Sequence, residues 1–129
     1  MRTGDRKLGP ASLRIRQCNA LPAHLRSGTR ELCDLQTQPD ARGQGHAGRL
    51  MHKVCAEADA AGLLLILIAD QFGDDGLNND QLCAWYAGRF GFQLLQAEPV
   101  RMLARMPGAT PRLFTLNPVR QAIELERSH

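Results

Sequence analysis

The sequence predicts an α/β fold, and three observations carry that prediction. Residues 13–18 alternate apolar and polar side chains, which is the period of a half-buried strand. Residues 45–62 place apolar side chains at helical spacing, and residues 63–69 form a short, uninterrupted apolar run. Strand, helix and strand in succession indicate helices packed on a sheet. With 129 residues, 43% of them hydrophobic, the chain supports one domain over residues 1–129 and is too short for two.

Ten segments are expected before the carboxyl-terminal tail. In order they are a loose arm (1–10), a strand (13–18), a turn (27–28), a strand (30–37), a loop (38–45), a helix (45–62), a strand (63–69), a polar loop (70–80), a helix (79–90) and a hairpin (92–98 and 100–106). The arm is polar and rich in glycine and proline, so the domain core is expected over about residues 11–106. Pro39 and the glycines after it end the second strand, because they continue neither a strand nor a helix.

Capping residues and periodicity predict the later elements. Gly62 stands where a helix-terminating glycine is expected. The strand after it lacks alternation, which is typical of a strand covered on both faces in a largely parallel sheet. The second helix carries a stripe of large side chains that includes Trp85, and the hairpin turns near Pro99. The tail, residues 107–129, is expected to hold a short helix capped by Asn117.

The composition argues against several classes of function. A net charge of +3, carried by dispersed arginines, attracts anionic ligands but lacks the basic cluster of a nucleic-acid-binding surface. The four cysteines form no C-x-x-C pair, and His46 and His52 are six residues apart on one helix, so we expect no metal. No signal peptide opens the chain, and its longest apolar run, residues 60–69, is far shorter than the roughly 20 residues of a membrane span. We therefore expect a soluble cytoplasmic protein with no nucleic-acid or membrane partner.

Three glycines at residues 43, 45 and 48 precede the first long helix in a G-x-G-x-x-G spacing. Exposed N–H groups at a helix start favour a phosphate, and glycines let it approach the backbone. A dinucleotide fold is disfavoured, because residues 38–42 separate strand from glycines and only 59 residues follow Asp70. A P-loop is excluded, since no Lys-Ser/Thr pair follows the glycines. A glycine turn that only starts a helix remains an alternative.

Two motifs resemble those of the GNAT superfamily of acyl-CoA N-acyltransferases. "QPDARGQGHAGRLM" is similar to its Arg/Gln-x-x-Gly-x-Gly/Ala signature, with Arg42, Gly45 and Ala47 at the three positions. "NNDQLCAWYAGRFGF" is similar to the later segment, an asparagine followed by a tyrosine-bearing helix that ends in Gly-Phe. The resemblance covers about residues 30–106. It implies a mixed central sheet flanked by helices, acetyl-CoA as cofactor, and transfer of an acetyl group to a primary amine.

The resemblance also implies which residues bind the cofactor. The pantetheine arm is expected to lie along the strand before the loop, at Leu35, Gln36 and Thr37. Asn79 matches the asparagine that commonly touches the cofactor, and a helix N-cap is its structural alternative. The pyrophosphate is expected to bind the loop and helix start, namely Arg42, Gly43, Gln44, Gly45, His46, Ala47 and Gly48.

Two residues are expected to take part in catalysis. The resemblance implies that Tyr86 donates a proton to the departing thiolate, although five residues rather than four separate it from Phe92. The extra residue is expected to be absorbed near Gly88, and it changes the direction in which the Tyr86 hydroxyl points. The alternative is that Tyr86 is a core aromatic residue beside Trp85. Glu31 is the candidate base, on a strand face shared with Cys33, Leu35 and Thr37, and a solvated charge is its alternative.

The amino-terminal part is shorter than the superfamily pattern, in which a strand and two helices precede the central strands and those helices wall the acceptor site. The acceptor site is then truncated, completed by the second subunit of a homodimer, or built from residues 70–78 and the tail. The acceptor, a small-molecule or peptide amine, stays open. We expect an acetyl-CoA-dependent N-acetyltransferase; a CoA-binding or interaction module with weak or no turnover is the alternative, and a nicotinamide-cofactor binder is a third.

Overall fold

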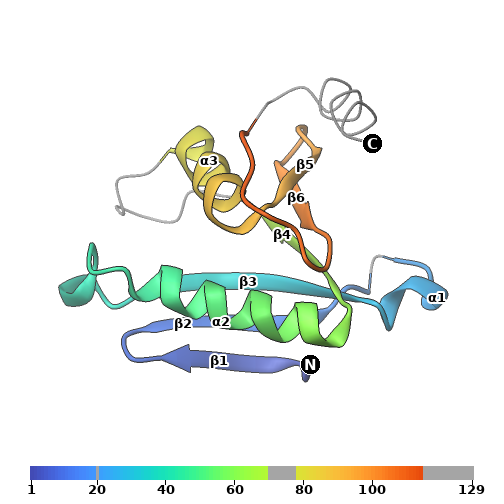
Figure 1. Cartoon of the computed structure of the whole chain (residues 1–129), viewed down its shortest axis with the longest axis horizontal. Coiled ribbons are helices and arrows are strands. Elements are labelled where there is room, and N and C mark those ends of the chain that lie inside the picture. Colours follow the sequence, from blue (N-terminus) through green and yellow to red (C-terminus); the bar gives the residue numbers. More distant parts are fainter. Residues whose placement is uncertain (20, 70–77, 115–129) are drawn as a thin grey trace. The chain divides into compact units, whose positions relative to one another are not determined.

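The computed structural model describes residues 1–19, 21–69 and 78–114 (Figure 1). The described residues fall into two compact units. The first unit comprises Met1–Leu67 with Met106–Gly108, and the second comprises Ile68–Arg105 with the segment from Ala109 onward. The expectation of one domain over residues 1–129 stays a prediction, and the two units are described separately.

The first unit is built on a sheet of four strands with both parallel and antiparallel pairs. Its elements are β1 (Gly4–Leu8), β2 (Ala11–Gln17), α1 (Ala23–Arg26), β3 (Thr29–Thr37), η1 (Pro39–Ala41), α2 (His46–Ala61) and β4 (Leu64–Ile68), whose last residue counts with the second unit. β1 pairs with β2 and β2 with β3 in antiparallel register, whereas β3 and β4 run parallel. The sheet is therefore mixed rather than largely parallel.

One face of this sheet is covered by α2 (Figure 1). Its buried side chains recur at three- and four-residue steps, so a single apolar stripe faces the strands. That stripe comprises Leu50, Met51, Val54, Cys55 and Ala58. The sheet contributes Ala11, Leu13, Ile15 and Leu32, all buried. Left-handed glycines bound the helix, Gly45 before it and Gly62 after it, and Leu63 N donates to Ala58 O (2.8 Å) in a Schellman-type ending.

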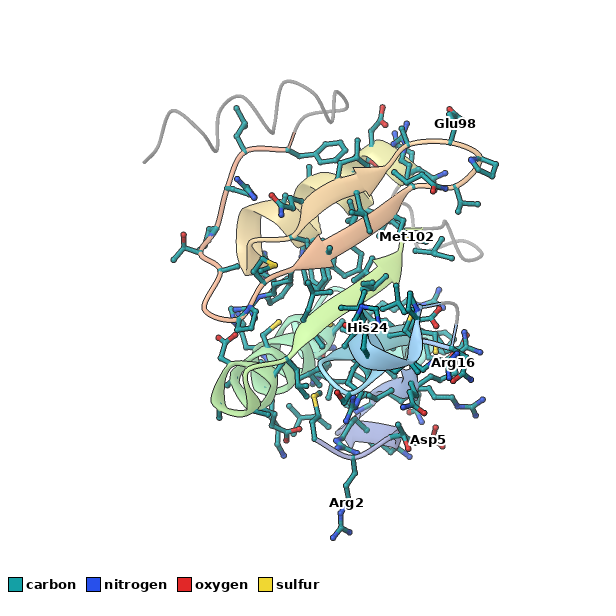
Figure 2. All side chains as sticks on the ribbon, turned by 90° about the vertical axis from the view of Figure 1, so that its right-hand side faces the viewer. Arg2, Asp5, Arg16, His24, Glu98 and Met102 are labelled. Carbon is teal, nitrogen blue, oxygen red and sulfur yellow. The ribbon has the colours of Figure 1, made fainter. Side chains whose placement is uncertain are left out.

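The second unit joins α3 (Asn79–Phe90) to a hairpin of β5 (Gln93–Gln96) and β6 (Met102–Arg105). Figure 2 shows Glu98 at the turn of this hairpin and Met102 at the start of β6. Aromatic rings form its core: Trp85 meets Tyr86 and Phe90 edge to face, with 5.1 Å between ring centroids in each pair. The contact of Tyr86 with Phe92, 5.6 Å between ring centroids, links the helix to the segment that leads into β5.

A buried arginine stabilises the end of α3. Arg105 on β6 donates from Nε to Phe90 O (2.6 Å) and from Nη2 to Ala109 O (3.1 Å). A guanidinium at a helix C-terminus satisfies carbonyls that lack intrahelical donors and opposes the negative end of the helix dipole. Arg112 N also donates to Ala87 O (2.9 Å), so the segment after β6 is tied to the same helix.

Most expected elements are confirmed, and one is wrong. The strands expected at 13–18, 30–37 and 63–69, both helices and the hairpin are present with ends shifted by a few residues. The expected loose arm instead forms β1, whose Asp5 carboxylate accepts from Arg14 Nε (3.1 Å) on β2. Charged side chains are ordinary on an edge strand and hide the period of two. The tail helix and the loop at 70–77 lie outside the described residues.

None of the helices among the described residues is long and apolar enough to cross a membrane.

Two glycines of α3 provide a matched pair for testing how that helix ends. Gly91 has φ +79°, and a Cβ there would lie 2.9 Å from the Thr110 carbonyl carbon, whereas Gly88 lies mid-helix with open space around it. We expect Gly91→Ala to lower the free energy of unfolding by about 2 kcal/mol or more. Gly88→Ala is expected to raise it by about 0.5–1 kcal/mol. Urea denaturation measures both, and equal effects would contradict the left-handed helix end.

Candidate functional site

An irregularity in β3 is the first feature of the site. Ser12 pairs with Gln36 and Arg14 with Cys33, so two residues of β3, Asp34 and Leu35, stand opposite the single residue between them on β2. Asp34 has φ +58°, in the left-handed region that few residues other than glycine, asparagine and aspartate adopt. This combination is a β-bulge, which bends a strand and redirects its backbone groups.

The bulge changes which side chains of β3 share a face. Cross-strand partners lie on the same face of a sheet. Thr37 pairs with the buried Ala11, so it lies on the face covered by α2, whereas Glu31 pairs with Arg16 on the opposite face. The expectation that Glu31, Cys33, Leu35 and Thr37 share one face is therefore wrong. The extra residue at the bulge reverses the alternation beyond it.

The end of β3 extends past its parallel neighbour. The ladder between β3 and β4 covers Thr29–Leu32 with Leu64–Leu67. Leu35, Gln36 and Thr37 come after that ladder, with Leu35 and Thr37 half-buried and Gln36 exposed. Backbone groups on that side of the strand can therefore pair with an extended ligand as a neighbouring strand would. This arrangement suits the sheet-like bonds expected of these three residues toward a pantetheine arm.

The glycine loop leads directly into α2 and leaves its first N–H groups available. Gly43 and Gly45 have φ of +81° and +80°, and Gly45 caps the helix without a side-chain hydrogen bond. The first intrahelical bond runs from Arg49 N to Gly45 O (3.1 Å). The N–H groups of His46, Ala47 and Gly48 precede it and have no intrahelical acceptor. We call the backbone from Gly43 to Gly48 the amide cradle.

The loop before the amide cradle is held by backbone oxygens of β3 and of the β1–β2 turn. Arg42 donates from Nε to Thr37 O (3.3 Å), and Gln38 N donates to Pro10 O (3.0 Å). Arg42, which was expected to bind the cofactor, therefore uses its Nε to join the end of the loop to the end of β3. These bonds fix the direction in which the loop enters α2.

Polar side chains gather beside the amide cradle. His46 Nε2 lies 3.2 Å from Gln44 Oε1, and His46 Nδ1 lies 2.8 Å from Arg49 Nη2. Arg49 was not among the expected site residues. The signal was available, because a long side chain one turn after the helix start points back toward the N-terminus.

In the second unit, Asn78 and not Asn79 caps α3. Asn78 Oδ1 accepts from Gln81 N (2.8 Å), and Gln81 Oε1 accepts from Asn78 N (2.9 Å), which completes a capping box. The N-cap alternative for Asn79 is therefore wrong. Asn79 Oδ1 is buried and has no hydrogen-bond partner among the described residues. An orphaned buried acceptor is costly, so it suits an external donor such as a ligand amide.

Tyr86 lies in the aromatic core of the second unit. Its side chain is 8% exposed, and its ring meets that of Phe92 edge to face at 5.6 Å between centroids. The helix continues without interruption through Gly88 to Phe90, so the extra residue is not absorbed at Gly88. Instead α3 is one residue longer after Tyr86, and one residue corresponds to about 100° around a helix. The packing favours the core-aromatic alternative, and the role as general acid stays a prediction.

The polar face of the first unit's sheet carries Glu31. Glu31 Oε1 accepts from Arg16 Nη2 (3.2 Å), and Arg16 is labelled in Figure 2. The ion pair competes with any proton transfer to this carboxylate, so the role as base stays a prediction. Burial raises the pKa of the neighbouring Cys33 thiol, which therefore remains protonated at neutral pH and is a poor nucleophile. Among residues 1–19, 21–69 and 78–114, no group of three or more His, Cys, Asp and Glu side chains is arranged to hold a metal ion.

Comparison with solved structures identifies the fold. The anti-CRISPR protein AcrVA5 is 15% identical, with a TM-score of 0.59 over 81% of this chain and 99% of its own. A putative GNAT-family acetyltransferase from Desulfovibrio desulfuricans is 16% identical (TM-score 0.54, 77% of this chain), and an N-acetyltransferase from Staphylococcus aureus Mu50 is 18% identical (TM-score 0.52, 74%). The aligned parts make up 62% and 59% of those two chains. No family model and no curated protein matches the sequence. The chain therefore has the GNAT fold that its motifs imply.

The bulge residue offers a test of the backbone geometry at the site. Asp34 is exposed and left-handed, so a residue without a Cβ relieves strain and a β-branched residue increases it. We expect Asp34→Gly to raise the free energy of unfolding by about 0.5 kcal/mol and Asp34→Val to lower it by about 1–2 kcal/mol.

The control is Gln36→Val, at an exposed β3 position without a positive φ. Valine is favoured in a regular strand, so this variant is expected to unfold at an unchanged or higher urea concentration than the wild type. If Asp34→Val were as stable as Gln36→Val, the left-handed assignment at Asp34 would be refuted.

Proposed function

We propose that this chain is an acetyl-CoA-dependent N-acetyltransferase of the GNAT superfamily that acts on a small-molecule or peptide amine. The observation that carries the proposal is the amide cradle. It offers uncapped helix N–H groups, left-handed glycines and the positive end of the α2 dipole to a pyrophosphate. The similarity in fold to a putative GNAT-family acetyltransferase and to an N-acetyltransferase supports the same assignment.

The residues present fit such a cofactor. Gly45 has φ +80°, which residues with a Cβ rarely adopt, and a Cβ there would stand 3.3 Å from Arg49 Nη1, inside the cradle. In the proposal the cradle holds the pyrophosphate, and the backbone of Leu35–Thr37 bonds the pantetheine arm. In the second unit, Asn79 Oδ1, which has no hydrogen-bond partner among the described residues, would accept from an amide N–H.

Acetyl-CoA, when bound, supplies an acyl group activated as a thioester. In the proposal, the backbone N–H near Leu35, at the bulge, would donate to the thioester carbonyl oxygen. Glu31, directly or through water, would accept the proton that the attacking amine loses as its N–C bond forms. Tyr86, in the second unit, would donate its phenolic proton to the sulfur as the C–S bond breaks.

A second candidate function is a GNAT-fold module that binds coenzyme A without turnover. Two observations favour it: the burial of Tyr86 against Trp85 and Phe92, and the ion pair that engages Glu31. In this alternative the cradle is retained, and the two side chains assigned to proton transfer have structural roles.

Binding is tested by a thermal shift with acetyl-CoA. At 100 times its dissociation constant, the ligand should stabilise the fold by about 2.7 kcal/mol. Gly45→Glu places a carboxylate in the cradle and is expected to abolish the shift. Gly62→Glu is the matched control, because it puts the same side chain on a left-handed glycine at the other end of α2 and should retain the shift. Survival of the shift in Gly45→Glu would refute the assigned cradle, and stabilisation by NAD in its place would favour a nicotinamide cofactor.

Turnover is tested with Tyr86→Phe, which removes the hydroxyl and keeps the ring contacts. Release of coenzyme A thiol is followed with a panel of amines and peptides. Loss of a general acid should lower kcat about 10²- to 10⁴-fold while the thermal shift with acetyl-CoA is unchanged. Equal rates for the variant and the wild type would rule out the acid role. A wild type that binds acetyl-CoA and turns over none of the acceptors would favour the binding module.

A further inference from the structure

Arg49 places a positive charge at the mouth of the amide cradle. It lies one helical turn after Gly45, and its Nη1 comes within 3.3 Å of the point where a Gly45 Cβ would stand. The side chain is exposed, so the guanidinium is accessible to a ligand. Helical side chains tilt toward the N-terminus, which accounts for this direction.

His46 holds that guanidinium in place. Because arginine carries only donors, His46 Nδ1 accepts from Arg49 Nη2 (2.8 Å), and His46 Nε2 then donates to Gln44 Oε1 (3.2 Å). The β1–β2 turn lies near the same ring nitrogen, since a Cβ at Gly9 would lie 3.9 Å from Nδ1. The two hydrogen bonds fix the orientation of the ring. Arg49 commits one N–H to His46 and keeps the others for a ligand.

The number of phosphate groups on the ligand determines whether Arg49 can contribute to binding. The N–H groups at a helix start point along the helix axis at a bound phosphate group. A diphosphate brings a second phosphate group, which needs a donor beyond the helix axis, and an arginine beside the cradle is suited to it. Phosphopantetheine carries one phosphate group and lacks the second one that Arg49 would bind.

We propose that His46 is a positioning residue that holds Arg49 as the second phosphate contact of the cradle. This chain thereby selects acyl carriers with a diphosphate, such as coenzyme A and its dephospho form, over phosphopantetheine. The inference rests on the proposed function, since it assumes that the cradle binds the phosphate end of an acyl carrier.

Calorimetric dissociation constants for dephospho-coenzyme A and phosphopantetheine test the selection. Arg49→Gln should weaken dephospho-coenzyme A binding about tenfold, the effect of one charge-assisted hydrogen bond. Phosphopantetheine binding should change by less than about twofold, because only long-range charge is lost. The adenosine moiety contributes equally to both proteins and cancels in this comparison. Lys53→Gln, an exposed lysine one turn further along α2, is the charge-matched control and should leave both constants unchanged.

The positioning role is tested at His46. His46→Leu should weaken dephospho-coenzyme A binding severalfold, and His46→Gln, whose side-chain oxygen can accept from Arg49, should restore most of it. In the Arg49→Gln background, His46→Leu should have no further effect, whereas independent roles would give additive losses. Additive losses, or equal weakening of both ligands by Arg49→Gln, would overturn the selection while leaving the proposed function intact. Failure of the wild type to bind either compound or acetyl-CoA would overturn the proposed function itself.

Discussion

The start of α2 is the constraint on which the candidate site depends. A helix must leave its first N–H groups without intrahelical acceptors, and most helices satisfy some of them with a side chain at the N-cap. Here the N-cap is Gly45, which has no side chain to offer. The N–H groups therefore require water or a ligand. The bulge in β3, the Arg42–Thr37 bond and the left-handed glycines all set the direction in which these groups point.

The second long helix shows how the chain satisfies a helix start with its own side chains. Asn78 and Gln81 satisfy the start of α3 through a capping box, and Arg105 and Gly91 satisfy its end. The same sequence thus contains one helix whose start is capped by its own side chains and one whose start is open. This contrast argues that the open start of α2 is a property of the site, because the chain uses the ordinary means of capping elsewhere.

Much of the fold was predictable, since it rests on patterns that a sequence displays directly. The apolar stripe of α2, the uninterrupted run of β4 and the Gly-Phe ending of α3 each identified an element. The bulge was hidden, because an extra residue in a strand leaves no mark until the pairing register is known. β1 was hidden for a similar reason, since its charged side chains hide the period of two and its partner strand defines it. The sequence suggested Asn79 as the N-cap of α3, one residue after the actual cap, Asn78. The two are the same residue type, so only the geometry distinguishes them.

The candidate site combines two kinds of contact with different sensitivity to substitution. The cradle binds through backbone N–H groups, so it needs particular dihedral angles at Gly43 and Gly45 more than particular side chains. Proton transfer, in contrast, needs the hydroxyl of Tyr86 and the carboxylate of Glu31 in defined positions. Substitutions that remove turnover can therefore leave carrier binding unchanged, whereas substitutions that fill the cradle remove both. Binding and turnover are separate properties of this fold, and each has to be established by its own measurement.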